Sequence, residues 1–465
     1  MRKVARIQPV GNLSLALPRR SARPKLSQGY HVTRMSAKIA MGCDWELGAK
    51  HWSRTSSCLL STQLPHWKLL WSCARQGGSH MIRLLMTLLA TFLLIGSAAG
   101  ATIHVDWTGA GDHLKIQEGL DAASPGDTVL VAPGTYVEWD IEMRGGVVLS
   151  GDGPSPNAVV VSASGVSRVF SCKGLSQPCS ISNLTITEGV ADPSGMHGSP
   201  QNCGGGVYCC DCELTLSECV LAGNEAWWGG GVFAGASCSV AIDGCLFMSN
   251  SAVIGGGGAI ALEDCTASID ECVLEGNSGH LSAGALRCKS SSPTMRHCLI
   301  VDNSANGDGG GIACYAGSSP SVTSCTFAGN YSFSFGIPEA GGSSLYCSGG
   351  SSPTLSHCIL AFGQSTQAVG CYDAESQPAL ECCDVYGNPE GNWVGCIADQ
   401  YGISGNISAD PCFCDCDNGD YTVSEESPCA PSNNACGELI GALDVGCGAS
   451  AIEVTTWGHL KALFR

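Results

Sequence analysis

Five segments of the chain share one six-residue pattern: CVLAGN (219–224), CLFMSN (245–250), CVLEGN (272–277), CLIVDN (298–303) and CTFAGN (325–330). Their cysteines follow one another at spacings of 26, 27, 26 and 27 residues, and the pattern continues at Cys358 and Cys383. A fixed period of this length is the sequence signature of a repeat architecture, in which each repeat stacks on the next.

Two further apolar segments belong to each repeat. One apolar pair stands five and three residues before each cysteine, as in Leu214/Leu216 and Val240/Ile242. Another follows a glycine-rich step, as in GGGVYC (204–209), GGGVFA (229–234) and GGGIAC (309–314). Alternation with period two predicts strands, and no repeat has ten residues at helical period. We therefore predict an all-β, single-stranded, right-handed parallel β-helix of about ten coils with three short strands per coil.

Coils of such a solenoid stack about 4.8 Å apart, so residues at equal positions form columns. We predict one inward cysteine column at Cys219, Cys245, Cys272, Cys298, Cys325, Cys358 and Cys383. A second column contains Cys212, Cys238 and Cys265, and a third contains Cys209, Cys288, Cys314, Cys347 and Cys371. These side chains either fill the core as small apolar thiols or form disulfides after export. We predict no metal, because the densest cysteine run, Cys412-Phe413-Cys414-Asp415-Cys416, lacks the paired C-x-x-C spacing of a zinc site.

An asparagine column accompanies the cysteines: Asn224, Asn250, Asn277, Asn303, Asn330 and Asn388. We expect it at a tight bend, because asparagine tolerates the left-handed conformation and its amide can bond to the next coil. At the start of the solenoid, HLKIQEGLDAA (113–123) predicts a capping helix with Leu114, Ile116 and Leu120 on one side.

Several stretches carry a family resemblance. IQEGLDAASPGDTVLVAPGTY (116–136) resembles the opening of right-handed parallel β-helix proteins of the pectin-lyase-like superfamily. The repeats resemble those of polymorphic outer-membrane proteins, and GDYTVSEESPCA (419–430) with IGALDVGCG (440–448) resembles the last coil of secreted bacterial β-helix proteins. The resemblance covers residues 102–448 and implies the fold. It leaves the function open, because this fold carries lyases, hydrolases, adhesins and passive surface proteins.

The apolar run LLMTLLATFLLI (84–95) follows the basic start Met81-Ile82-Arg83 and precedes small residues. This layout predicts a signal peptide over 81–101, which is too short for a membrane span. We expect translation to start at Met81. Residues 1–80 are then either untranslated or a disordered extension, and 449–465 form a short tail. The mature chain is predicted to be secreted or on the cell surface, and monomeric.

Charge narrows the choice of partners. Residues 1–100 carry a balance of +12, and residues 101–465 carry −30. Because residues 101–465 are so acidic, they repel nucleic acid. A polyuronate would need bridging cations, so calcium is a possible cofactor, and no other cofactor is expected. The acidic run DCDNGD (415–420) is either a calcium loop or a turn in the last coil.

The stretch between the asparagine and the glycine-rich strand varies in length, and insertions on one side of a solenoid often mark the binding face. The outward residues of the strand that follows are predicted to be Tyr208, Phe233, Ala261, Arg287, Ala313 and Tyr346. Aromatic residues gather in the variable stretches and on this strand. We predict them as glycan contacts, with cover of the solenoid flank as the alternative: Trp227, Trp228, Tyr208, Phe233, Tyr331, Phe333, Phe335 and Tyr346. The resemblance implies a substrate groove at the same place.

Catalysis has weaker candidates: Arg287, Asp302, Asp308 and His280. In lyases of the resembled superfamily the base is typically an arginine or lysine beside acidic calcium ligands. A hydrolase needs two carboxylates about 5–10 Å apart. The signature runs of polygalacturonases and pectate lyases are absent from the sequence. We therefore expect a glycan-binding, adhesive or structural surface protein. The alternatives are a polysaccharide lyase or glycoside hydrolase acting on the same face, and a passive spacer.

Overall fold

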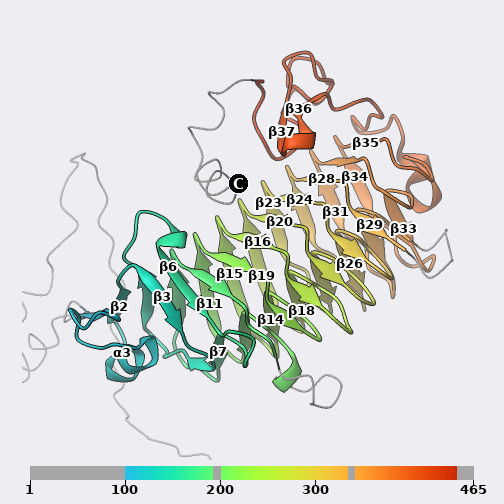
Figure 1. Ribbon diagram of the computed structural model, residues 1–465. Helices are drawn as coiled ribbons and strands as arrows, with labels where there is room; N and C mark the ends of the chain where they lie inside the picture. The colour runs from blue at the N-terminus through green and yellow to red at the C-terminus, as the bar shows by residue number, and fades with distance from the viewer. Residues whose placement is uncertain (1–99, 192–199, 334–340, 448–465) are drawn as a thin grey trace, which may run out of the picture. The chain divides into compact units, whose positions relative to one another are not determined.

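The computed structural model describes residues 100–191, 200–333 and 341–447, which belong to one compact unit, Thr91–Arg465. Within these ranges the backbone winds into a stack of parallel coils (Figure 1). The predicted right-handed parallel β-helix is confirmed. The predicted signal peptide and the C-terminal tail lie almost entirely outside the described residues. In the described part, no helix is both long and apolar enough to cross a membrane.

Three long sheets run the length of the stack. Sheet A contains β1 (Thr102–Val105), β2 (Thr128–Val131), β5 (Val148–Gly151), β8 (Cys179–Ser182), β11 (Glu213–Ser217), β15 (Ser239–Asp243), β19 (Thr266–Asp270), β23 (Thr294–Arg296), β27 (Ser321–Thr323), β31 (Thr354–Ser356) and β34 (Ala379–Glu381). Sheet B contains β3 (Gly134–Val137), β6 (Val159–Ser162), β9 (Thr185–Thr187), β12 (Val220–Ala222), β16 (Leu246–Met248), β20 (Val273–Glu275), β24 (Leu299–Val301), β28 (Thr326–Ala328), β32 (Ile359–Ala361) and β35 (Asp384–Tyr386).

Sheet C completes each coil. It contains β4 (Ile141–Glu142), β7 (Phe170–Lys173), β10 (Val207–Cys210), β14 (Val232–Gly235), β18 (Ile260–Glu263), β22 (Leu286–Lys289), β26 (Ile312–Tyr315), β30 (Leu345–Cys347) and β33 (Val369–Cys371). The sequence did not predict a fourth, narrow sheet D, which contains β13 (Glu225–Ala226), β17 (Ser251–Ala252), β21 (Ser278–Gly279), β25 (Ser304–Ala305) and β29 (Tyr331–Ser332).

The period-two pairs lie where the sequence predicts them. Leu214 pairs with Val240, and Leu216 pairs with Ile242, in the parallel register of sheet A. All four side chains are buried in one core that extends through the coils. Burial of this apolar column is the main stabilising contribution, at about 25 cal/mol per Å² of surface removed from water.

The asparagine column forms an unbroken hydrogen-bond ladder from Asn224 to Asn330. In each step the Oδ1 atom accepts from the backbone N–H and the side-chain amide of the asparagine one coil earlier. For Asn277 the distances to Asn250 N and Nδ2 are 2.9 and 3.0 Å. The Asn277 amide in turn donates to Phe247 O at 3.0 Å and Asn303 Oδ1 at 3.0 Å. The predicted bond from coil to coil is confirmed.

The predicted left-handed backbone of these asparagines is wrong. The residue before each of them has the positive φ instead: Gly223, Ser249, Gly276, Asp302, Gly329 and Gly387. The physical reason is that the preceding residue turns the chain outward, which leaves the asparagine side chain free to point into the stack. A residue of positive φ stands in the same way before each cysteine of the inward column, for example Glu271 before Cys272.

The seven cysteines of the inward column are all buried free thiols in the structure. Cys272 Sγ donates to Asp270 O at 3.0 Å and accepts from Cys245 N at 3.4 Å. The same contacts recur at Cys298, whose thiol donates to Arg296 O at 3.0 Å. Of the two alternatives, this column therefore takes the form of stacked thiols rather than disulfides.

The N-terminal cap is shorter than predicted. The helix α3 spans Ile116–Ala122 and buries Ile116 and Leu120, whereas Leu114 precedes it and is 54 % exposed. The Glu138 carboxylate accepts from the N–H groups of Ile116 and Gln117 at 2.8 and 3.2 Å. This carboxylate satisfies donors at the start of the helix from a distant part of the chain, which fixes where α3 begins.

The C-terminal segment leaves the repeat. Its elements are η5 (Gly395–Gln400), β36 (Phe413–Asp415), η6 (Cys416–Asn418) and β37 (Asp420–Val423), and β36 pairs with β37 in antiparallel fashion. Figure 1 shows this pair in red beside the later strands of sheet B, near β24 and β28. Two further short 3-10 helices, η1 (Pro156–Ala158) and η2 (Pro200–Asn202), lie in turns nearer the start.

The disulfides of the described residues all involve this C-terminal region: Cys371–Cys396, Cys382–Cys436 and Cys414–Cys447. Tyr421 packs with Val301 and Ala328 against sheet B. The C-terminal segment thus covers part of one sheet and fastens itself covalently to the last coils.

Candidate functional site on the outer face of sheet C

The outer side chains of sheet C form two adjacent rows. In the first row the parallel register places Tyr208, Phe233, Ala261, Arg287, Ala313 and Tyr346 side by side, as the sequence predicts. A second row, two residues further along each strand, contains Lys173, Cys210, Gly235, Glu263, Lys289 and Tyr315. We call both rows, with the side chains of Arg168, Trp228 and Asp308 that contact them, the sheet C face.

The sheet C face is less open than the predicted groove. Tyr208, Tyr346 and Arg287 are only 5, 4 and 7 % exposed. Their neighbours Phe233, Trp228 and Tyr315 are half-buried. Side chains of adjacent coils and of the preceding loops cover the first row, so the accessible edge of the face lies at these half-buried aromatic residues.

Arg287 is the centre of the face. Its guanidinium carbon lies 4.3 Å from the centroid of the Trp228 ring and 5.5 Å from that of Tyr315. Gly255 makes room for the indole, because a β-carbon there would lie 2.3 Å from Trp228 Cδ2. Contacts of a cation with aromatic faces are worth about 0.5–2 kcal/mol. They hold the planar guanidinium in one orientation.

The electrostatic partners of Arg287 leave one donor unused. Its Nη1 atom is 3.8 Å from Glu263 Oε2, and Glu263 is also in an ion pair with Lys289. Within the described residues Nη1 has no hydrogen-bond partner although it is buried. A buried donor without an acceptor is unfavourable by about 1–3 kcal/mol, and more when it is charged. An oxygen atom of a ligand would satisfy it.

Asp308 adds a carboxyl group to the same face. The Tyr315 hydroxyl donates to Asp308 Oδ2 at 3.1 Å, and the Tyr315 and Tyr346 rings are 5.7 Å apart. Burial raises the pKa of Asp308 above its ordinary value, although bonds from both tyrosines oppose the shift. The group is thus more readily protonated than an exposed aspartate.

A second basic–aromatic set lies towards the N-terminal coils. The Arg168 guanidinium is 4.7 Å from the centroid of the Tyr208 ring, and that ring stacks parallel to Phe233 at 5.8 Å. Arg168 also donates to Gln201 O at 2.8 Å. Sheet C therefore collects Arg168, Lys173, Arg287 and Lys289 on one side of a chain whose body is strongly acidic.

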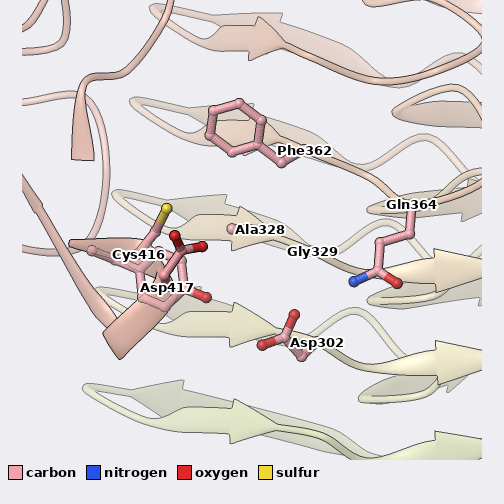
Figure 2. Close-up of a pocket in the computed structure, with 8 residues that line it drawn as sticks. Asp302, Ala328, Gly329, Phe362, Gln364, Cys416 and Asp417 are labelled. Atoms are coloured by element: carbon pink, nitrogen blue, oxygen red, sulfur yellow. The ribbon is translucent and has the colours of Figure 1, made fainter. Parts of the chain in front are cut away.

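The candidates Asp302 and Asp308 contact different residues. Asp302 is the turn residue of positive φ that precedes Asn303, and it lies by sheet B. It lines a cavity of about 470 Å³ with Ala328, Gly329, Phe362, Gln364, Cys416, Asp417 and Tyr421. Figure 2 shows Asp302 on the strand side of this cavity and Cys416 and Asp417 across from it. The loop between the two aspartates turns them to different sides of the coil.

The remaining predicted residues have other surroundings. His280 is exposed, and its Nδ1 is 3.4 Å from Asn306 Nδ2. Tyr331 belongs to sheet D, and Phe333 after it is 55 % exposed. Trp227 is half-buried, and its backbone N–H donates to Asn202 O. Phe335 lies outside the described residues.

The acidic run at 415–420 forms local bonds. The Asp415 carboxylate accepts from Asn418 Nδ2 at 2.8 and 3.0 Å, and Asp420 Oδ1 accepts from Thr422 N at 3.0 Å. These are the bonds of a turn, which is one of the two predicted alternatives. Calcium binding at this run stays a prediction.

The sequence analysis missed Glu263, Lys289, Tyr315 and Arg168. Glu263, Lys289 and Tyr315 could have been predicted from the sequence. Each four-residue strand has two outward positions, and the prediction used only the first of them. Arg168 precedes its strand, β7, and so falls outside the alternation. Its contact with Tyr208 depends on stacking between coils.

The comparisons with known proteins agree with this fold. The family model described as "Right handed beta helix region" matches residues 161–358 and, in a second, overlapping match, residues 230–408. Together the matches span more than half of the chain. The chain belongs to the right-handed beta helix family. No curated protein matches its sequence.

Solved structures similar to this beta helix protein include enzymes. A pectin methylesterase from Aspergillus niger is 14 % identical with a TM-score of 0.31, over 61 % of this chain and 83 % of the esterase. A PL6 family alginate lyase is 12 % identical with a TM-score of 0.30, over 77 % of this chain and 59 % of the lyase. A mannuronic acid specific lyase from human gut microbiota is 15 % identical with a TM-score of 0.24, over 62 % of this chain and 86 % of that one. At these values the likenesses identify no activity for this chain.

Proposed function

We propose that this beta helix protein binds a neutral or weakly acidic glycan at the sheet C face and that it does so outside the cytoplasm. The observation that carries the proposal is Arg287, which is oriented by Trp228 and Tyr315 and whose buried Nη1 has no acceptor among the described residues. Sugar rings stack on aromatic side chains, and their oxygen atoms accept hydrogen bonds. Disulfides in the C-terminal region support export, because such bonds persist in oxidising compartments.

Charge argues for a weakly charged ligand. Arg168, Lys173, Arg287 and Lys289 are balanced in part by Glu263 and Asp308. A densely charged polyuronate would meet the acidic remainder of the chain, whose balance over residues 101–465 is −30. Binding of such a polymer would require divalent cations.

The test is binding to a panel of soluble xylan, galactomannan, β-glucan, polygalacturonate and alginate, by calorimetry with and without calcium. Arg287→Ala and Trp228→Ala are expected to lower the affinity for the bound glycan by about tenfold or more. Arg296→Ala is the matched control, because Arg296 is an exposed arginine on sheet A. Absence of binding to the whole panel, or equal affinity of Arg287→Ala and Arg296→Ala, would contradict the proposal.

A glycoside hydrolase or polysaccharide lyase is the second candidate. The observation in its favour is Asp308, whose pKa is raised by burial and which lies beside the Arg287 cluster. A carboxyl group of this kind can act as a general acid. Release of reducing ends or of unsaturated products from a panel glycan, lost in Asp308→Asn and kept in Asp302→Asn, would establish this alternative.

A further inference from the structure

Three buried thiols meet at the turn that joins sheet C to sheet A. The Sγ atoms of Cys209, Cys212 and Cys238 all lie within 4.8 Å of one another. Cys209 Sγ is 2.9 Å from Cys212 Sγ and 3.2 Å from Cys238 Sγ. Cys209 is thus the central member, in contact with both others. These distances between sulfur atoms are shorter than an ordinary van der Waals contact between two thiols.

Two of the three thiols belong to one coil, and the third belongs to the next coil. Cys209 lies in β10, and Cys212 follows it in a Cys-x-x-Cys spacing just before β11. Cys238 stands at the corresponding place one coil later, just before β15. A bond from Cys209 to Cys212 would close a turn within one coil. A bond from Cys209 to Cys238 would join two coils.

The net charge that each would leave in the core favours a disulfide over a metal ion at this site. Three thiolates around one monovalent or divalent ion leave a net negative charge in the core, and burying an unpaired charge is strongly unfavourable. A disulfide is neutral and keeps the site apolar. The same chain already forms disulfides at three places in the described residues, so the oxidation of thiols is compatible with its fold.

We propose that Cys209, Cys212 and Cys238 are a disulfide-exchange site, in which Cys209 bonds alternately to Cys212 and to Cys238. A small-molecule disulfide is the oxidant. Cys212, the most exposed of the three at 7 %, attacks it as the thiolate, and one thiol of the oxidant leaves. Cys209 then attacks Cys212 Sγ and releases the second thiol. Two protein S–H bonds are replaced by one S–S bond, and the oxidant is reduced to two thiols.

The exchange step needs no further oxidant. Cys238 attacks Cys209 Sγ, the bond between Cys209 and Cys212 breaks, and Cys212 leaves as the thiolate and takes up the proton that Cys238 lost. Cys238 Sγ lies 3.2 Å from Cys209 Sγ, so the attacking atom is already next to the sulfur that it attacks.

The test traps the bonds in the full-length protein. The protein is equilibrated in oxidised and reduced glutathione, quenched in acid, alkylated without reduction and cleaved at glutamate, because no lysine or arginine separates Cys209 from Cys238. We expect two species by mass spectrometry, an internal Cys209–Cys212 bond and a Cys209–Cys238 cross-link. Cys238→Ser should leave the first bond alone, and Cys212→Ser should leave neither because it removes the thiol that attacks the oxidant, while the control Cys272→Ser should keep both.

Two results would overturn the proposal. One is alkylation of all three thiols in protein equilibrated with the glutathione couple. The other is a stoichiometric amount of zinc or copper by elemental analysis in protein whose three cysteines form no disulfide. Both are measured on the unmodified chain, so a variant that fails to fold does not affect them.

Discussion

The middle coils and the C-terminal segment use cysteine in opposite ways. Between residues 213 and 361 one cysteine recurs at the same place in each coil and is a buried thiol. Between residues 371 and 447 the repeat ends. Six of the ten cysteines there form three disulfides, and Cys383, Cys412, Cys416 and Cys429 are free thiols. In the middle coils each thiol donates to the carbonyl two residues earlier, as Cys298 does to Arg296. In the C-terminal segment the same residue type joins parts of the chain that share few strand contacts.

The comparison teaches that the regularity of the coil decides what cysteine does. A regular coil supplies hydrogen-bond partners and apolar neighbours to each residue of a column, so the thiol needs no covalent partner. An irregular segment has fewer such contacts, and there a cross-link restricts the unfolded chain and holds the segment in place. The following changes test the contacts of the regular coils and those of the C-terminal segment separately.

The largest effect is expected from the asparagine ladder. Asn277→Ala removes bonds to Phe247 O and Asn303 Oδ1 and leaves donors of Asn250 without their acceptor. We expect a loss of about 3–5 kcal/mol in the free energy of unfolding, measured by urea denaturation. Asn306→Ala, at an exposed asparagine, is the control and should change little. Equal losses for the two variants would show that the ladder is dispensable.

The next effect concerns the C-terminal segment. Replacing Cys382 and Cys436 by serine opens a disulfide whose cysteines are 54 residues apart. We expect about 2–4 kcal/mol of lost stability, confined to the C-terminal segment. Hydrogen exchange should accelerate in residues 395–447 and stay slow in the middle coils. Uniform acceleration along the chain would mean that the two regions unfold as one unit.

A third effect depends on pH. Asp384 is fully buried, and burial raises its pKa to about 7 in the folded chain. The folded state then binds the proton more tightly than the unfolded state, whose carboxyl has its ordinary pKa near 4. The free energy of unfolding should therefore fall as pH rises from about 4 to 7, by about 3 kcal/mol.

Asp384→Asn should remove this decline, whereas Asp399→Asn, at an exposed aspartate, should keep it. Urea denaturation of both variants at pH 4.5, 5.5, 6.5 and 7.5 measures the slope. A slope unchanged by Asp384→Asn would assign it to another group.

The smallest effect is expected in the thiol column. Cys272→Ala removes one buried sulfur and its weak hydrogen bonds, and should be unfavourable by about 1 kcal/mol. Cys416→Ala, at a partly exposed thiol, should be close to neutral. Thermal unfolding of both variants, carried out without reductant, measures the two losses of stability. A loss for Cys272→Ala as large as that for the Cys382–Cys436 pair would indicate that Cys272 is cross-linked in the native protein.

The sequence by itself determined the period, the parallel coil, the inward apolar pairs and the two ladders, because each follows from residues that recur at equal positions along the chain. It also predicted the first row of the sheet C face from the same alternation. The tertiary structure alone decided that the residue before each asparagine, and not the asparagine itself, has the left-handed backbone conformation. It also separated Asp302 from Asp308, and placed Arg168 on Tyr208 and Trp228 on Arg287.

The choice between thiols and disulfides was likewise decided in three dimensions. The reason is physical: a column follows from spacing in one coil, whereas the path of a loop, the cover over a face and the approach of two sulfur atoms depend on contacts between coils and between distant segments.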